Sequence, residues 1–348
     1  MIASFVDWDN AFPRVCPKLG IQSFLENGVR PSIIPLLVNY FQNRKMSVKW
    51  HDCFSTPILI NGGGPQGATL GILVYLSLSN SCSKFIETDN KYRFIDDLTV
   101  LEIVDLLSLK IEKFDVQKSV PNDIPVHNNI VDPEELVTQA NLNNLERWTD
   151  QKKMVLNSRK TKMMIINFSR NKQFTSRVKL NNQNIGIVDE AKILGKTITS
   201  SSSWKKNTDI LIKKANARMQ LLAKIASFGA SVKDLKDVYN LFVRSILEQS
   251  SVVWGSSLTR EQKIAIERVQ KTAVKIISNN QAINYKKALS KLEMKSLEER
   301  RSDLSLNFAK KCLQNAKTAD YFPIKTKNHT KNLRANEKFK INTALKER

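Results

Sequence analysis

The stretch YRFIDDLTVL (residues 92–101) decides the fold of the first half of the chain. Two apolar runs, Tyr92–Ile95 and Leu98–Val104, are separated only by Asp96 and Asp97. Apolar runs joined by two polar residues predict two strands in a tight hairpin. Both carboxylates are therefore expected at the hairpin tip.

A third carboxylate follows another predicted strand. Residues 2–6 form an apolar run that ends at Asp7, which predicts a buried strand followed by an acid. Mg²⁺ prefers oxygen ligands and typically takes one or two carboxylates plus substrate phosphates. Two such ions can assist phosphoryl transfer, so Asp7, Asp96 and Asp97 are candidate metal ligands. An Asp-Asp pair between strands is also an ordinary turn, and both interpretations stay open at this point.

The remaining patterns of the first half predict a mixture of helices and strands. Helices are expected at residues 16–27, 31–42, 68–86 and 133–151, and strands at 45–50, 56–60, 163–168 and 178–198. The glycines of NGGGPQG (61–67) break the chain before the third helix. Residues 105–131 carry mixed charge and two prolines, so a loop or insertion is expected there.

From Trp204 onward the pattern is helical almost to the end. Four helices are expected, at residues 209–228, 232–248, 259–278 and 297–315. The third has an apolar stripe at spacings of three and four, made by Ile266, Val269, Ala273 and Ile276. Basic residues lie roughly opposite: Arg268, Lys271 and Lys275. This basic face is either a solvated surface or a track for phosphates.

Charge divides the chain into two unequal parts. The 348 residues include 55 Lys and Arg against 33 Asp and Glu, a formal net charge of +22. Residues 1–150 hold 13 basic and 18 acidic side chains, whereas residues 151–348 hold 42 and 15. A basic excess concentrated in one part is typical of proteins that bind a polyanion, most often nucleic acid. A solubilising surface, or a basic tail on an enzyme of small molecules, is the alternative.

The cysteines and histidines exclude two classes of small domain. The four cysteines lie far apart, with no pair at CxxC spacing, and the chain has three histidines. Neither a disulfide framework nor a zinc module is indicated, which favours a reducing intracellular compartment, nucleus or cytoplasm. No signal peptide or membrane span is expected, because the apolar stretches at 33–38 and 70–78 are too short to cross a bilayer.

Five motifs stand in a characteristic order: SFVDWDNAF (4–12), NGGGPQGATLG (61–71), YRFIDDLTVL (92–101), LERWTDQKKMVLNSRKTKMMIIN (145–167) and AKILG (191–195). Their order and spacing resemble the palm of reverse transcriptases, most closely those of non-LTR, LINE-type retrotransposons. RSILEQSSVVWGSSL (244–258) also looks like that family.

The resemblance implies an α+β fold with three regions. The first, residues 1–200, would be a polymerase palm, an antiparallel sheet with helices on one face, carrying the insertion at 105–131. A basic all-helical thumb and connection would follow at 201–316, and a basic flexible tail at 317–348. The sequence leaves the oligomeric state open.

The same resemblance implies RNA-templated DNA synthesis. A primer 3′-hydroxyl would attack the α-phosphate of a deoxynucleoside triphosphate, with two Mg²⁺ ions, an RNA template and a DNA primer. Asp7 and Asp96 would bind both ions, Asp97 would support the site, and the backbone carbonyl of Trp8 would be a further ligand. Lys160 would be a candidate acid for the departing pyrophosphate.

Substrate contacts are implied as well. Phe12 matches the family's aromatic gate, whose ring would stack under the sugar and clash with a 2′-hydroxyl, although an ordinary core aromatic is the alternative. Gln66 and Gly67 would lie close to the nucleotide. Leu194 and Gly195 correspond to the hairpin that grips the primer end.

The chain departs from the family at several places. Pro13 stands where the family usually has Asp, and Ile95 where it usually has Ala. The family's fingers region precedes the Asp7 motif, and only six residues stand there, so we expect a fragment with little polymerase activity alone. No endonuclease domain is recognisable. The alternatives are a degenerate retroelement product that only binds nucleic acid, and an RNA-templated RNA polymerase, against which Phe12 argues.

Overall fold

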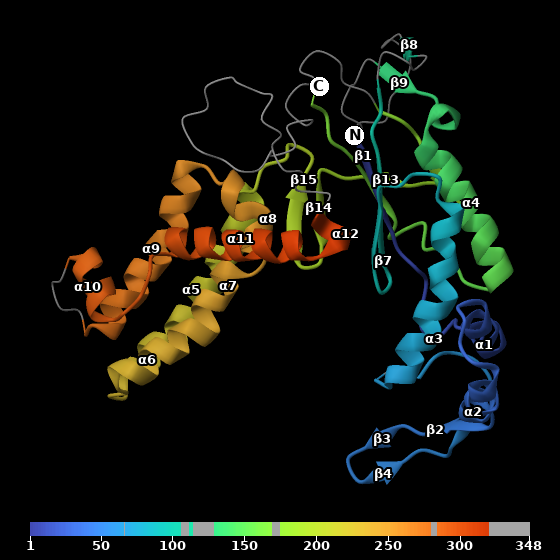
Figure 1. Cartoon of the computed structure of the whole chain (residues 1–348), viewed down its shortest axis with the longest axis horizontal. Coiled ribbons are helices and arrows are strands. Elements are labelled where there is room, and N and C mark those ends of the chain that lie inside the picture. Colours follow the sequence, from blue (N-terminus) through green and yellow to red (C-terminus); the bar gives the residue numbers. More distant parts are fainter. Residues whose placement is uncertain (66, 106–110, 114–128, 169–174, 280–283, 320–348) are drawn as a thin grey trace. The chain divides into compact units, whose positions relative to one another are not determined.

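The computed structural model describes residues 1–65, 67–105, 111–113, 129–168, 175–279 and 284–319. The chain divides into two compact units, Met1–Ile193 and Leu194–Arg348, each with its own hydrophobic core. Figure 1 shows the elements of both units, coloured from blue at the N-terminus to red towards the C-terminus. The α+β class expected from the sequence is confirmed.

A five-stranded sheet forms the centre of the first unit, in the order β13-β10-β1-β7-β6. Neighbouring strands are antiparallel except β10 and β13, so the expected all-antiparallel sheet is wrong at this edge. The connection after β10 passes through a further hairpin and is long enough to return the chain in the same direction. The strands are β1 (Ile2–Val6), β6 (Lys91–Phe94), β7 (Asp97–Glu102), β10 (Lys162–Ile165) and β13 (Gly186–Ile187).

Two helices cross between these strands. Helix α3 (Thr69–Asn80) precedes β6, and α4 (Val137–Lys152) lies between β7 and β10. Together with the strand order β10-β1-β7-β6 this is the β-α-β-β-α-β arrangement of ferredoxin-like folds, with further segments inserted.

The two faces of the sheet differ in what covers them. Val100 and Met163 both pair with Ser4 and pack with residues of α3 and α4 in the core. Side chains alternate along a strand, so Phe5 and its partner Thr99 lie on the opposite face. That second face carries the candidate site.

The β6–β7 hairpin differs by one residue from the sequence prediction. Phe94 pairs with Asp97, so the two-residue turn consists of Ile95 and Asp96, and Asp97 begins β7 rather than forming part of the tip. Favoured two-residue turns need a positive φ at their first residue, and Ile95 supplies it with a φ of 56°. A branched side chain rarely adopts this conformation, which is why the sequence pattern placed the turn one residue later than the structure does.

The far end of β7 holds α4 in place through one buried carboxylate. Glu102 accepts hydrogen bonds from the backbone N–H groups of Val137 and Thr138 at 3.0 and 2.8 Å, and from the Thr138 hydroxyl at 2.6 Å. The first N–H groups of a helix lack partners within it, and their partial positive charge favours an anion. Glu102 therefore fixes the start of α4 to the sheet.

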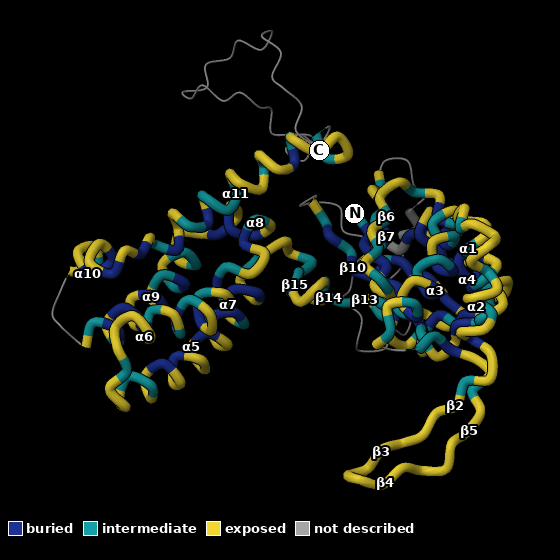
Figure 2. The backbone as a smooth tube through the Cα atoms, turned by 60° about the horizontal axis from the view of Figure 1, so that its bottom comes forward, coloured by how far each residue is buried: buried dark blue, intermediate teal, exposed yellow. Residues whose placement is uncertain are grey.

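Two helices and a long hairpin lie between β1 and α3. The helices are α1 (Pro17–Glu26) and α2 (Ile34–Phe41), and the 3₁₀ turn η1 (Pro31–Ile33) directly precedes α2. We name the hairpin, residues 44–60, the arm. Its strand pairs are β2 (Arg44–Met46) with β5 (Ile58–Ile60) and β3 (Lys49–Trp50) with β4 (Cys53–Phe54). Figure 2 shows the arm projecting from its unit with most of its residues exposed.

The glycine turn, residues 61–67, is held by hydrogen bonds made to its backbone groups. The N–H of Gly64 donates to the carbonyl of Phe12 at 2.8 Å, and Nη2 of Arg44 donates to the carbonyl of Gly63 at 2.6 Å. The turn thus joins the arm to the segment that follows β1.

The remaining elements of the first unit are short: η2 (Ser81–Phe85), β8 (Ile111–Lys113), β9 (Asn129–Val131), η3 (Pro133–Glu135), β11 (Lys179–Leu180), β12 (Gln183–Asn184) and β14 (Glu190–Ile193). The helix expected at 68–86 is α3 followed by the 3₁₀ turn η2. In the expected insertion, β8 and β9 form a strand pair, and most of the other residues lie outside the described part of the chain.

Apart from the strand β15 (Lys196–Thr199), the second unit is helical in its described part: α5 (Lys205–Ser227), α6 (Val232–Val238), η4 (Tyr239–Arg244), α7 (Ser245–Glu248), α8 (Ser251–Trp254), η5 (Gly255–Ser257), α9 (Arg260–Ile277), α10 (Tyr285–Lys291), α11 (Leu297–Gln314) and α12 (Ala316–Ala319). The four helices predicted from sequence are confirmed, the second being interrupted by the π-helical η4. The tail expected at 317–348 lies outside the described residues from residue 320 onward.

The core of the second unit contains the predicted stripe of α9. Ile266, Val269 and Ala273 are buried, and Ile276 packs against them half-buried. At the centre, the hydroxyl of Tyr239 donates to Oε1 of Gln270 at 2.6 Å. The predicted inward face of α9 is confirmed.

Gly71 gives a test of the glycine turn. A Cβ at this position would lie 1.9 Å from the carbonyl oxygen of Pro65. Alanine ordinarily stabilises a helix relative to glycine, but here we expect Gly71→Ala to lower the free energy of unfolding by about 1–3 kcal/mol or more. Thermal and urea unfolding would measure it. Gly62→Ala is the control, because nothing lies within 4 Å of its Cβ; equal stability of the two variants would contradict this packing.

Candidate active site and nucleic-acid interface

The register between β1 and β7 brings two of the three predicted acids together. Val6 pairs with Leu98, so Asp7, the next residue, stands opposite Asp97. Both line a pocket of about 280 Å³, together with Phe5, on the face of the sheet that α3 and α4 leave uncovered.

A turn after α4 places a lysine at the same pocket. Oδ1 of Asn157 accepts the backbone N–H of Lys160 at 3.0 Å, and the buried hydroxyl of Thr161 accepts the N–H of Asp7 at 3.2 Å. Lys160 and Lys162 both line the pocket, and the Lys162 ammonium donates to a backbone carbonyl at 2.7 Å. Sequence reasoning singled out Lys160 but assigned no role to Asn157 or Thr161, although both belong to the LN..KT motif.

The carboxylates of the pocket repel one another. Burial raises the pKa of Asp7 above its usual range; the Lys160 ammonium opposes the rise, and the charges of Asp96 and Asp97 add to it. Burial, and then the charge of Asp96, raises the pKa of Asp97. Partial burial and neighbouring negative charges both disfavour the ionised form of a carboxyl group. A cation bound in the pocket would therefore relieve the repulsion between these carboxylates.

Asp96 stands beside the pocket rather than in its lining. Its charge reaches Asp7 and Asp97, and it contributes, after burial, to the raised pKa of Tyr75, a fully buried residue of α3. The structure therefore sets Asp97 opposite Asp7 in the lining of the pocket and places Asp96 in the adjoining turn, where its charge also raises the pKa of Asp7.

The donor chemistry of these acids fits Mg²⁺. Among the described residues, no three His, Cys, Asp or Glu side chains are grouped tightly enough to hold a metal ion by themselves. Mg²⁺ does not require such a cage, because it usually keeps several waters and takes one or two carboxylates plus substrate oxygens. Asp7 with Asp97 or Asp96 would supply that number.

Trp8 is held by its ring and its backbone. The ring is buried and lies edge-on to that of Trp148 in α4, with centroids 5.4 Å apart. Trp8 forms an isolated β-bridge with Leu156. Its two hydrogen bonds are made by the residues on either side: the N–H of Asp9 donates to the carbonyl of Val155, and the N–H of Asn157 donates to the carbonyl of Asp7. The bridge leaves the Trp8 carbonyl unused, and its role as a metal ligand stays a prediction.

The residues predicted to contact the nucleotide lie around the glycine turn. Phe12 is half-buried, and its ring centroid lies 4.7 Å from that of Tyr75. This packing is compatible both with an aromatic gate under the sugar and with an ordinary core aromatic. Gly67 has a φ of 85°, which a side chain would strain. Gln66 lies outside the described residues.

The hairpin predicted to grip the primer is present. Leu194 and Gly195 form a two-residue turn between β14 and β15, with φ values of 44° and 79°. Positive φ at both positions is the pattern of a type I′ turn, for which Leu is an unusual first residue. Leu194 is 53% exposed, and residues of β14 line the Asp7 pocket.

The predicted basic face of α9 is exposed. Arg268, Lys271 and Lys275 all face solvent, and the Lys271 ammonium lies 5.4 Å from the ring centroid of Tyr285. Whether this face binds phosphates stays a prediction.

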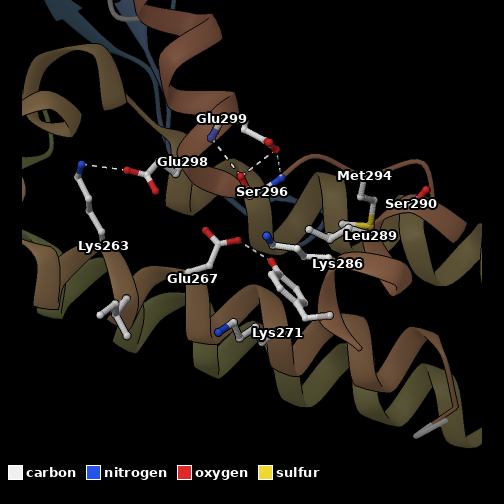
Figure 3. Close-up of a pocket in the computed structure, with 12 residues that line it drawn as sticks. Lys263, Glu267, Lys271, Lys286, Leu289, Ser290, Met294, Ser296, Glu298 and Glu299 are labelled. Carbon is white, nitrogen blue, oxygen red and sulfur yellow. Dashed lines mark hydrogen bonds and ion pairs between the residues drawn. The ribbon is translucent and has the colours of Figure 1, made fainter. Parts of the chain in front are cut away.

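A larger pocket beside α9, of about 590 Å³, has its acids occupied by structural contacts (Figure 3). Glu267 accepts hydrogen bonds from the Tyr285 hydroxyl and the N–H of Leu297. Glu298 pairs with a lysine, and Glu299 completes the capping box of α11. These contacts join α9, α10 and α11, and they assign no chemistry to the pocket.

Comparisons with known proteins name no family for this chain. No protein-family model matches it, and no curated protein matches it. Among the described helices, none is long and apolar enough to cross a membrane.

Replacing Asp7 tests the repulsion in the pocket without any assay of activity. Because the folded-state pKa of Asp7 is raised, its protonation stabilises the fold; that contribution is complete below the unfolded pKa and is lost as pH rises through the folded one. At neutral pH, Asp7→Asn should raise the free energy of unfolding by about 0.2–1 kcal/mol, and this gain should vanish in acid.

Thermal unfolding with and without Mg²⁺ extends this test. Mg²⁺ should raise the melting temperature of the parent chain, because a ligand of the folded state stabilises it, but should do so less for Asp7→Asn. Asp89→Asn is the control, because Asp89 stands before the start of β6, at the end of that strand away from the β6–β7 turn. Lower stability of Asp7→Asn at neutral pH, or an equal response to Mg²⁺, would contradict the assignment.

Replacing Arg268, Lys271 and Lys275 together by Gln tests the basic face. If each contacts one phosphate of a duplex, the slope of log affinity against log salt should flatten by up to ~2 to 3. Fluorescence anisotropy over a salt series would measure it. The control variant replaces Lys224, Lys233 and Lys236 by Gln, which removes the same charge elsewhere in the unit. If the salt slope flattened equally in both triple variants, only the net charge of the unit would matter, and the basic face would not be a specific binding surface.

Proposed function

We propose that the first unit is the palm of an RNA-directed DNA polymerase, and that the chain is a reverse transcriptase of the non-LTR retrotransposon kind. The observation that carries the proposal is the β1–β7 register, which sets Asp7 opposite Asp97 in one pocket, with Asp96 in the adjoining turn. Acids on neighbouring strands beside an open pocket could hold divalent cations, and those cations would in turn bind the phosphates of a polyanionic substrate.

The resemblance of the five motifs supports the same interpretation, because four of them meet around this pocket. The Asp7 motif and the DD hairpin supply the carboxylates, the LN..KT turn supplies Lys160, and AKILG supplies β14. These segments are far apart in the sequence, so their presence around one pocket supports the interpretation that they serve a single site.

In this proposal Mg²⁺, when bound, would lower the pKa of the primer 3′-hydroxyl and neutralise charge on the departing pyrophosphate. Asp7 and Asp96 would hold the ions, with Asp97 and the Trp8 carbonyl completing the site. Lys160 would protonate the departing pyrophosphate or offset its charge. Thr161 would position Asp7 through the backbone hydrogen bond.

The nucleotide would be selected by the segment next to β1. Phe12 would lie under the sugar and exclude a 2′-hydroxyl, and Gln66 and Gly67 would border the base or sugar. Leu194 and Gly195 would hold the primer end, and the basic face of α9 would follow the duplex through its phosphates.

A second candidate is a retroelement-derived protein that binds nucleic acid without polymerising it. The left-handed conformation of Ile95, beside Asp96, favours it, because a bulky residue in the catalytic turn constrains the position of that carboxylate. The net charge of +22 is compatible with both candidates.

Primer extension on an RNA template tests the proposal. Asp96→Asn keeps the shape of the side chain but removes a charge that offsets a divalent ion, so Mg²⁺-dependent extension should fall at least about 100-fold while template binding persists. Asp89→Asn should extend like the parent chain. Because little extension is expected from this chain alone, the assay is run with and without a separately supplied fingers segment. Extension that survives Asp96→Asn would contradict the metal assignment, and salt-sensitive binding with no extension even when the fingers segment is present would favour the second candidate.

A further inference from the structure

The tip of the arm, residues 49–54, presents aromatic rings to solvent. Trp50 is 75% exposed and Phe54 is 68% exposed. They belong to adjacent pairs of the β3–β4 ladder, where Lys49 opposes Phe54 and Trp50 opposes Cys53, so the two rings project to opposite faces of the hairpin tip. Leaving two large rings in water at the end of a projecting hairpin is unfavourable, which indicates that something covers them.

Cations accompany these rings. The Lys49 ammonium lies 5.5 Å from the ring centroid of Phe54, and Lys45 is exposed on β2, nearer the base of the arm. His51, in the turn, has its ring edge-on to Trp50 with centroids 5.2 Å apart. The tip therefore combines flat apolar surfaces with positive charge.

A protein partner fits this combination less well than a nucleic acid does. Aromatic residues are common at protein interfaces, but lysine is depleted there. Association with a second copy would bring together chains that each carry +22, and this repulsion opposes it. The exposed aliphatic side chains of the arm lie mainly on β2 and β5, near its base, away from the rings.

We infer that the arm tip binds single-stranded nucleic acid, with bases stacked on Trp50 and Phe54 and phosphates met by Lys45 and Lys49. Bases within a duplex are already stacked and paired, whereas those of a single strand leave their faces open to aromatic rings. The inference goes beyond the proposed polymerase and does not need it, because it concerns binding without metal or nucleotide.

Fluorescence anisotropy of the full chain with a labelled 12-nucleotide oligo(dT), in EDTA, tests the inference. Trp50→Ala and Phe54→Ala should each weaken binding roughly 5- to 100-fold with an unchanged salt slope, because they remove stacking and not charge. Replacing Lys45 and Lys49 by Gln should flatten the slope by about 0.7 for each phosphate that is no longer neutralised. Phe228→Ala is the control, since Phe228 is 78% exposed but lies in the other unit.

An oligomer of abasic sites separates stacking from other causes. On this backbone without bases, the parent chain and Trp50→Ala should bind equally, and Trp50→Phe should restore most of the affinity for oligo(dT). Equal effects of Trp50→Ala and Phe228→Ala would overturn the inference. So would oligo(dT) binding unchanged by Trp50→Ala together with a loss of self-association in sedimentation, because the tip would then be a protein interface. Because the binding is measured in EDTA and without nucleotide, its result does not depend on the polymerase test.

Discussion

The pairing of β1 with β7 is the constraint on which the candidate site depends. A shift of one residue in this register would turn every side chain of β1 to the other face. Asp7 would then leave the pocket and Val6 would leave the core. Ile2 and Val6 are buried on the helix side of the sheet, so the same hydrophobic contacts that hold the fold also set Asp7 opposite Asp97.

The candidate site also depends on contacts that carry no chemistry. Thr161 accepts the N–H of Asp7, and Asn157 shapes the turn that presents Lys160. Glu102, at the other end of β7, fixes the start of α4, whose Trp148 packs against Trp8. A few buried polar and aromatic contacts thus join the strands and helices around the pocket. These contacts set the positions of Asp7 and Asp97, although they take no part in the proposed chemistry.

The elements with strong periodicity could be predicted from the sequence, and the irregular positions could not. The stripe of α9 and the strand before Asp7 follow from apolar spacing alone. The hairpin at residues 92–104 was predicted, but the position of its turn at Ile95 was not, because a branched residue with positive φ contradicts local preference and is imposed by strand pairing. The interruption of the helix at η4 and the parallel edge strand β13 likewise depend on tertiary packing, which no local pattern records.

Arg44 gives the arm a mechanical connection to the rest of its unit. Its guanidinium lies 5.2 Å from the ring centroid of Phe41 and donates to the carbonyls of Gly62 and Gly63. Arg44 therefore fastens the base of the arm to the glycine turn. Any movement of the arm relative to the sheet would have to stretch or break these hydrogen bonds, so a ligand that restrained the arm would also restrain the turn.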